Sequence, residues 1–250
     1  MKQLEIRELT RDFGGLRAVD KVSFAVDQGS LTAIIGPNGA GKTTLFNLIT
    51  GALRPSAGSV AFEGKTLSPA PHKTARVGIA RTFQNVRLFS EMTLLENLLC
   101  ASNTDSFLRG SLWPPFQQES ERLRVKKSCY ILEDLGLLED RESLAGDLPF
   151  GRQRLAEIAR ALARKPRLLL LDEPAAGLNR NETTQLAKYI RHIVSSGVTV
   201  LLVEHDMQLV MNLAERVVVL ENGRLIADGS PGEVRQDARV VQAYLGSGAC

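Results

Sequence analysis

The sequence has few cysteines, and their pattern speaks against a structural metal site. Its three cysteines, Cys100, Cys129 and Cys250, are odd in number and lack the spacing of metal ligands. We interpret them as reduced thiols with a structural or surface role, which is typical of a reducing compartment. The first residues, 1–5, lack the apolar region of a secretory signal. We therefore expect the protein to stay in the cytoplasm.

Long hydrophobic runs are also missing. The longest, at 168–171 and 198–203, have the length of strands, whereas a helix needs roughly 18 to 20 apolar residues to cross a bilayer. The sequence therefore predicts that the chain cannot form a membrane pore alone. Hydrophobic residues still make up 44% of the chain, which is ample for a buried core.

Neither sign of charge dominates. The chain has 31 Lys and Arg against 28 Asp and Glu, a net charge of +3, and the basic residues are dispersed along it. This balance gives no support for nucleic acid or membrane lipid as a partner.

A glycine-rich stretch lies between a strand-like run, 31–35, and a helix-like stretch, 45–50, and matches the pattern G-x-x-x-x-G-K-[ST]. Glycines allow positive φ and a close approach of backbone to phosphate, and amides at a helix N-terminus favour an anion. Lys42 adds a positive charge for the terminal phosphates, and Thr43 offers a hydroxyl to Mg²⁺. The sequence predicts a nucleoside triphosphate site made by Gly36, Pro37, Asn38, Gly39, Ala40, Gly41, Lys42, Thr43 and Thr44.

Two later apolar runs end in polar residues. Asp172 and Glu173 follow the run 168–171, and in a phosphate-loop protein the first carboxylate at such a strand end completes the magnesium site. Glu173 can act as general base for the water that attacks the γ-phosphate. His205 follows the run 198–203, and ligands of open α/β sheets bind at the carboxyl ends of strands. A lone His there is more often structural, but beside the other features His205 becomes a candidate site residue.

Two weaker candidates precede the middle of the chain. Alternating residues at Leu4–Leu9 and Val22–Val26 predict two short antiparallel strands, and Phe13 lies between them. Its chemistry alone leaves open whether it stacks on a nucleotide base or belongs to the core. Gln84 ends a short apolar segment, 78–84, and as an isolated residue is either a surface amide or a ligand of magnesium or water.

The middle of the chain is helical in character. Leucines recur at helical spacing between 93 and 135, which predicts an inserted helical subdomain. The stretch Asp105 to Glu119, with its Trp and two Pro residues, predicts an exposed loop. A further helix after Leu148 has Leu155, Ile158, Ala159 and Leu162 on one predicted apolar face.

Taken together, these motifs resemble the ATP-binding-cassette (ABC) ATPases along essentially the whole chain. The discriminating stretch occupies the place of the family's signature, L-S-G-G-Q, and consists of Leu148, Pro149, Phe150, Gly151, Arg152 and Gln153. The resemblance implies an α/β phosphate-loop fold in one ABC ATPase domain, 1–250. About 1–90 and 166–250 would form the catalytic core with an N-terminal antiparallel β subdomain, and about 91–165 the α-helical signature subdomain.

The resemblance also implies ATP and Mg²⁺ as cofactors. By position, Phe13 corresponds to the base-stacking aromatic residue and Gln84 to the glutamine that senses magnesium and the attacking water. Glu173 matches the catalytic base, and His205 the switch histidine that holds the γ-phosphate. The implied catalytic residues are therefore Glu173, His205, Lys42 and Gln84. The implied metal ligands are Thr43, Gln84 and Asp172.

The signature departs from the usual pattern. Pro149 and Phe150 replace Ser and Gly, so the hydroxyl that would reach a γ-phosphate is missing, although Gly151 and the helix N-terminus remain as anion donors. Arg152 stands where Gln is usual; its charge either strengthens phosphate contact or faces solvent. Asn179 replaces the more usual Asp of the family's dimer-contact loop.

Within the family, the chain is similar to ATPase subunits of branched-chain amino acid importers, the LivG type, at 81–89, 91–93, 174–179, 204–207 and 243–246. This likeness implies a second ATPase subunit, paralogue or self, in an ATP-sandwich dimer. It also implies two transmembrane permease subunits, a periplasmic or extracellular substrate-binding protein, and a peripheral location on the inner face of the membrane. Related importers for amides or urea use similar ATPases and remain an alternative.

Two rivals from other classes fit less well. A soluble cassette protein of translation or DNA maintenance would normally carry two cassettes or a long coiled-coil insertion, and the sequence has neither. A GTP-dependent switch protein would carry an N-K-x-D base-reading motif, which is missing.

Overall fold

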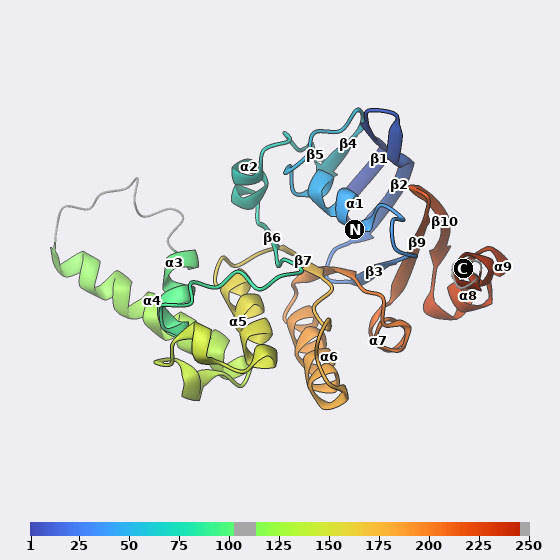
Figure 1. Ribbon diagram of the computed structural model, residues 1–250. Helices are drawn as coiled ribbons and strands as arrows, with labels where there is room; N and C mark the ends of the chain where they lie inside the picture. Colours follow the sequence, from blue (N-terminus) through green and yellow to red (C-terminus); the bar gives the residue numbers. More distant parts are fainter. Residues whose placement is uncertain (103–113, 246–250) are drawn as a thin grey trace. The chain divides into compact units, whose positions relative to one another are not determined.

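The computed structural model describes residues 1–102 and 114–245 (Figure 1). The contacts among them divide the chain into two compact units. The core unit comprises the described residues of Met1–Arg81, Arg167–Ala175 and Ile190–Cys250. The helical unit comprises those of Thr82–Pro166 and Ala176–Tyr189. Residues 82–90 and 176–189 thus group with the helices.

The core unit holds an antiparallel sheet in the order β2-β1-β4-β5. Its strands are β1 (Lys2–Phe13), β2 (Leu16–Asp27), β4 (Ala57–Phe62) and β5 (Lys65–Thr66). The predicted antiparallel pair is confirmed, but β1 and β2 have 12 residues each and are longer than expected. Glu8 and Lys21 have positive φ values of 46° and 49°, and the register shifts nearby. These bulges interrupt the alternation from which the strand lengths were predicted.

A second sheet of the core unit has the order β10-β9-β3-β8-β7-β6. Its strands are β3 (Leu31–Ile35), β6 (Ile79–Arg81), β7 (Leu168–Asp172), β8 (Thr199–Val203), β9 (Arg216–Glu221) and β10 (Arg224–Gly229). Strands β9, β3, β8, β7 and β6 pair with one another in parallel, and β10 pairs antiparallel with β9 in a hairpin. Every residue of β3, β7 and β8 is buried, which explains their continuous apolar runs.

Helix α1 (Lys42–Ile49) supplies the centre of the hydrophobic core of this unit. Its Leu45, Phe46 and Ile49 are fully buried. They share one cluster with residues of both sheets, including Leu4, Ile6, Val60 and Phe62 from the first and Ile34, Leu170, Leu201 and Val218 from the second. Burial between two sheets fixes the start of α1 beside the end of β3. The other short helices of the unit are α2 (Pro71–Arg76), α7 (Met207–Leu213), α8 (Pro231–Gln236) and α9 (Ala238–Leu245).

The helical unit contains α3 (Leu94–Ser102), α4 (Pro114–Asp134), η1 (Leu138–Asp140), η2 (Ala145–Asp147) and α5 (Phe150–Leu162). The division between units runs through α6 (Arg180–Ser195). The loop predicted for Asp105–Glu119 is wrong in its second part, because α4 begins at Pro114. Proline is well tolerated in the first turn of a helix, where its missing N–H would be unpaired anyway. The part at 105–113 lies outside the described residues.

Helix α5 forms where it was predicted, but its buried face differs. Ile158 and Ala159 are buried, whereas Leu155 and Leu162 are only half-buried. Two charged residues, Arg154 and Glu157, are buried on the same helix. Among the described helices of both units, none is sufficiently long and apolar to cross a membrane.

Candidate functional site

The glycine-rich loop joins β3 to α1 in a backbone path that two of its glycines make possible. Gly36 and Gly41 have positive φ values of 150° and 97°. A Cβ atom on Gly36 would lie 2.1 Å from the carbonyl oxygen of Leu220, and one on Gly41 would lie 2.4 Å from that of Ala18. Any side chain at these positions would collide with backbone, so the loop requires glycine there.

Lys42 begins α1 and points back into the loop. Its Nζ donates hydrogen bonds to the carbonyl oxygens of Gly36, at 2.7 Å, and Pro37, at 3.0 Å. Burial lowers the pKa of Lys42, while the carboxylates of Glu173 and Asp172 act in the opposite direction. The loop therefore encloses an ammonium group that faces two carboxylates of the same unit.

Those carboxylates come from the strand next to β8. Strands β3, β8 and β7 are parallel neighbours, so their carboxyl ends share one edge of the sheet. Asp172 is 3% exposed and ends β7. Glu173 has a φ of 48°, an uncommon value for a residue with a side chain, and its N–H donates to the carbonyl of Val203 at 2.9 Å. His205 follows β8, and its Nδ1 lies 3.9 Å from Oε2 of Glu173.

The edge of the core unit thus brings together four residues that the sequence singled out, namely Lys42, Asp172, Glu173 and His205. Thr43 is exposed in the first turn of α1. Among the described residues, no group of three or more His, Cys, Asp and Glu gathers into a ready-made metal cluster.

Arg81 is a residue of this edge that the sequence analysis missed. It ends β6, and its guanidinium donates to Oδ2 of Asp172 at 2.7 Å and to Oδ1 of Asn47 at 2.6 Å. The two charged side chains are 8% and 4% exposed, so the ion pair is buried. The pair orients the Asp172 carboxylate and compensates its charge. In the sequence, the position of this charged residue at the end of a short apolar segment was the feature from which Arg81 could have been predicted.

Phe13 lies at the end of β1, beside the tight turn to β2. It is 42% exposed, so the alternative of an ordinary core residue is wrong. The guanidinium of Arg11 lies 4.5 Å from the centre of its ring, within the range of a cation–π contact. Stacking on a nucleotide base stays a prediction.

The C-terminal helix also reaches the phosphate loop. Burial raises the pKa of Tyr244 in α9, and the backbone of Gly36 acts in the opposite direction through its N–H. The hydroxyl of Tyr244 therefore lies at the first glycine of the loop. The stretch 243–246 was noted in the sequence only for its likeness to a subgroup, and this contact was not predicted.

In the helical unit, a buried ion pair holds the segment that contains Gln84. Arg154 donates to the carbonyls of Phe83, at 2.9 Å, and Gln84, at 2.7 Å. Glu157 accepts from the N–H of Phe83, and the two charged side chains, each 2% exposed, lie 3.4 Å apart. Burial raises the pKa of Glu157, and its backbone donors and Arg154 oppose that rise. The Gln84 side chain is exposed.

The signature segment uses its polar side chains within its own unit. Arg152 forms an ion pair with Asp140 and donates to the carbonyl of Gly136 at 3.0 Å. Gln153 donates to the carbonyl of Leu148 at 2.8 Å. The sequence left open whether the Arg152 charge contacts phosphate or faces solvent. Neither alternative describes these contacts, because the guanidinium connects α5 to η1.

Phe150 and Gly151 at the start of α5 contact the segment before α6. A Cβ on Gly177, which has a φ of 81°, would lie 2.9 Å from the Phe150 ring. A Cβ on Gly151 would lie 2.5 Å from Oε1 of Glu182. The stretches 148–153 and 176–182 are therefore closely packed.

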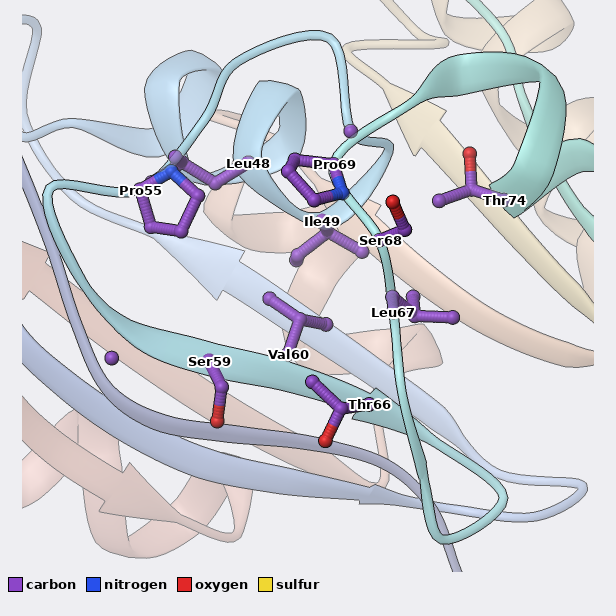
Figure 2. Close-up of a pocket in the computed structure, with 12 residues that line it drawn as sticks. Leu48, Ile49, Pro55, Ser59, Val60, Thr66, Leu67, Ser68, Pro69 and Thr74 are labelled. Carbon is purple, nitrogen blue, oxygen red and sulfur yellow. The ribbon is translucent and has the colours of Figure 1, made fainter.

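A cavity of about 200 Å³ lies beside the end of α1 in the core unit (Figure 2). Its lining is mainly apolar, with hydroxyl groups from four residues, and includes none of the residues predicted for nucleotide. It is lined by Leu48, Ile49, Gly51, Pro55, Gly58, Ser59, Val60, Thr66, Leu67, Ser68, Pro69 and Thr74.

Comparison with known proteins gives consistent matches along the chain. The family model described as ABC transporter matches residues 19–176, and that of the branched-chain amino acid ATP-binding cassette transporter matches residues 224–250. The chain is 46% identical to the high-affinity branched-chain amino acid transport ATP-binding protein BraF of Pseudomonas aeruginosa, over 97% of each chain. It is 42% identical to LivG of Salmonella typhimurium, again over 97% of each.

Solved structures agree. The ADP conformation of an ATP-binding cassette of an ABC transporter superposes with a TM-score of 0.86 at 36% identity, and the match covers 98% of this chain and 99% of the other. A nucleotide-free ATP-binding cassette matches with a TM-score of 0.85 at the same identity and coverage. From this likeness along its length, we conclude that the chain belongs to the ABC transporter family of ATP-binding proteins.

Proposed function

We propose that the chain is the ATP-hydrolysing subunit of an importer for branched-chain amino acids. The observation that carries the ATPase activity is the edge of the core unit, where Lys42, Asp172, Glu173 and His205 meet at the ends of parallel strands. Support for the substrate class comes from the relatives BraF and LivG, which are described as branched-chain amino acid transport proteins. The family match at residues 224–250 supports the same class.

Residues 36–44 would hold the phosphates of ATP. Their amides precede and open α1, and the positive end of that helix favours an anion. Lys42 now donates to two carbonyls of its own loop and would exchange these bonds for terminal phosphate oxygens. Phe13, exposed at the hairpin end, would stack on the adenine.

The residues present fit a magnesium ion. Thr43, Gln84 and Asp172 offer hydroxyl, amide and carboxylate oxygens, which are the donors Mg²⁺ takes together with phosphate and water. When bound, Mg²⁺ supplies charge neutralisation at the outer phosphates. Arg81 would keep Asp172 oriented toward this position.

Hydrolysis would be divided among three side chains. Glu173 would accept a proton from the attacking water, and its unusual backbone conformation directs the carboxylate from the strand end. His205 would hold the γ-phosphate, and Gln84 would orient the water. Catalysis of this kind is mainly positioning and charge stabilisation, since the protein forms no covalent intermediate.

The complete site would be shared with a second ATPase subunit, a paralogue or a second copy. Residues Leu148–Gln153 of one protomer would cover the ATP on the other's phosphate loop. With the polar side chains of Arg152 and Gln153 directed into their own unit, the backbone at Gly151 would make the phosphate contact. We propose that residues 1–250 act as one ABC ATPase domain in this dimer.

The remaining partners follow from the transporter function. Two transmembrane permease subunits would bind the dimer at the inner face of the membrane, and a periplasmic or extracellular binding protein would deliver the substrate. Neighbouring genes for two hydrophobic subunits, a second ATPase and a secreted binding protein would support this assembly.

The test is reconstitution of the chain with those subunits in proteoliposomes. We expect ATP hydrolysis to rise when the binding protein is loaded with leucine, and labelled leucine to accumulate, whereas urea and acetamide produce neither effect. Uptake of urea or an amide in place of leucine would overturn the substrate class. Hydrolysis of GTP but not ATP by the purified chain would overturn the ATPase itself.

A further inference from the structure

The end of β8 carries a carboxylate to which the proposed reaction gives no role. Glu204 directly follows Val203, and its side chain is 0% exposed. An ionised carboxylate only accepts hydrogen bonds, and a buried one requires donors around it. The identity of those donors shows which parts of the molecule this residue holds together.

Glu204 receives backbone N–H groups from two different strand ends. Its Oε1 accepts from the N–H of Ala175 at 2.8 Å, and its Oε2 accepts from the N–H of His205 at 3.1 Å. Burial raises the pKa of Glu204, and the backbone N–H groups of Ala175, His205 and Asp206 oppose that rise because they favour the charged form. One carboxylate therefore connects the turn after β8 to the turn after β7.

These two turns carry residues proposed for hydrolysis. Ala175 lies two positions after Glu173, and His205 is adjacent to Glu204. Nδ1 of His205 lies 3.8 Å from Oε2 of Glu204 and 3.9 Å from Oε2 of Glu173. The His205 side chain is 63% exposed, so burial contributes little to fixing the imidazole. The backbone of its turn, which Glu204 anchors, has to set its position.

We propose that Glu204 is a positioning residue for ATP hydrolysis, which anchors the turn of His205 to the neighbouring strand end and so sets the place of the imidazole relative to Glu173. The inference rests on the proposed ATPase function. A residue with only a structural role would lower stability, whereas loss of Glu204 is expected to lower turnover because it displaces His205.

A double-mutant cycle tests this dependence, with Glu204→Gln and His205→Ala introduced into the full-length chain and ATP hydrolysis measured in the reconstituted transporter. Glu204→Gln keeps the size of the side chain but turns one acceptor into an NH₂ group that faces a backbone N–H. We expect kcat for ATP hydrolysis to fall about tenfold, with KM for ATP changed by less than about twofold. His205→Ala lowers kcat further, and the double variant is as slow as His205→Ala within about twofold.

A second readout follows the imidazole directly. In proton NMR spectra, the ring resonances of His205 are assigned by their loss in His205→Ala, and they shift in Glu204→Gln while those of His72 and His192 do not. If Glu204→Gln does not fold, Glu204→Asp, which keeps the charge but shortens the side chain by one methylene, enters the same cycle.

Asn97→Ala is the matched structural control. Asn97 is also fully buried, and its amide bonds to the backbone of Phe89 and Thr93 in the helical unit. We expect this variant to lower Tm without changing kcat.

The outcomes separate the two hypotheses. The positioning role is overturned if kcat is unchanged in Glu204→Gln, or if the loss in the double variant equals the product of the losses in the two single variants. The proposed function still stands in that case if the wild type hydrolyses ATP and Glu173→Gln does not. A reconstituted transporter that contains the wild-type chain and does not hydrolyse ATP overturns the proposed function and the positioning role with it.

Discussion

The strand ends of the core unit and the signature segment of the helical unit hold their polar site residues in different ways. In the core unit, Glu173 and His205 follow buried strands, and the His205 side chain is 63% exposed at the sheet edge. In the helical unit, Arg152 and Gln153 turn back onto the backbone of their own unit, and Arg154 is 2% exposed. The difference indicates that the strand ends of the core unit offer side-chain atoms to a ligand, whereas the signature segment, unlike the exposed Gln84 of the same unit, presents backbone and shape.

This contrast predicts that substitution of a strand-end side chain lowers the rate, whereas substitution of the buried Arg154 in the helical unit lowers stability. The largest expected effect is in Glu173→Gln, because loss of a general base removes about a thousandfold of the rate. We expect kcat to fall by that factor, while ATP binding, measured by fluorescence titration, and Tm stay near wild type. With ATP, the variant should elute as a stable dimer in size-exclusion chromatography.

Glu63→Gln is the matched control, since Glu63 has a φ of 49°, close to the 48° of Glu173, but lies away from the sheet edge in the turn from β4 to β5. Its turnover should equal that of wild type. Normal turnover in Glu173→Gln would remove this residue from its role and break the comparison at its strongest point.

The second effect belongs to the helical unit. Arg154→Met leaves Glu157 buried without its cationic partner, and breaking a buried ion pair of this kind costs about 3 kcal/mol or more of folding free energy. Chemical denaturation should report this loss. Arg141→Met, which removes an exposed pair with Glu142, should stay within about 1 kcal/mol of wild type. Equal effects of the two variants would contradict the importance of burial.

A smaller effect is expected for the unusual signature residue. Arg152→Gln should preserve kcat within about tenfold, or roughly 1.4 kcal/mol, because the guanidinium contacts Asp140 and the Gly136 carbonyl. Steady-state ATPase kinetics check this expectation. A larger loss without a change in Tm would show that the side chain touches nucleotide.

The smallest effect is expected for Phe13→Ala. Loss of one aromatic stacking contact should weaken ATP binding by about 1 kcal/mol, or roughly fivefold in Kd. Isothermal titration calorimetry measures this change, and Phe13→Tyr, which retains the ring, should bind ATP like wild type. Unchanged affinity in Phe13→Ala would leave its contact with Arg11 as the only described role of the ring.

The sequence predicted the core unit well where local pattern determines structure. Continuous apolar runs correspond to β3, β7 and β8, and the polar residues that end them meet because parallel strands align their carboxyl ends. The Asn222-Gly223 turn, with φ values of 47° and 77°, joins β9 and β10, and an Asn-Gly pair between two apolar runs is in itself a hairpin signal.

Residues that act through distant partners were not predicted. Arg81 and Asp172 are 91 positions apart, and Arg154 is 71 positions from Phe83. Local periodicity cannot predict such pairs, because they form only in the folded chain. Arg81 meets Asp172 when β6 and β7 become neighbours, and Arg154 meets Phe83 when α5 packs beside the segment 82–87. Charged residues within apolar stretches were the only visible sign of them.

The contact between Gly177 and Phe150 links two sequence positions during evolutionary change. Position 177 combines a φ of 81°, which glycine and asparagine tolerate best, with an aromatic ring 2.9 Å from where a Cβ would be. Asparagine meets the first requirement and violates the second. Homologues with a small residue at 150 lack this contact, so asparagine at 177 should be more frequent among them than among homologues with an aromatic residue at 150, and an alignment should show the two positions changing together.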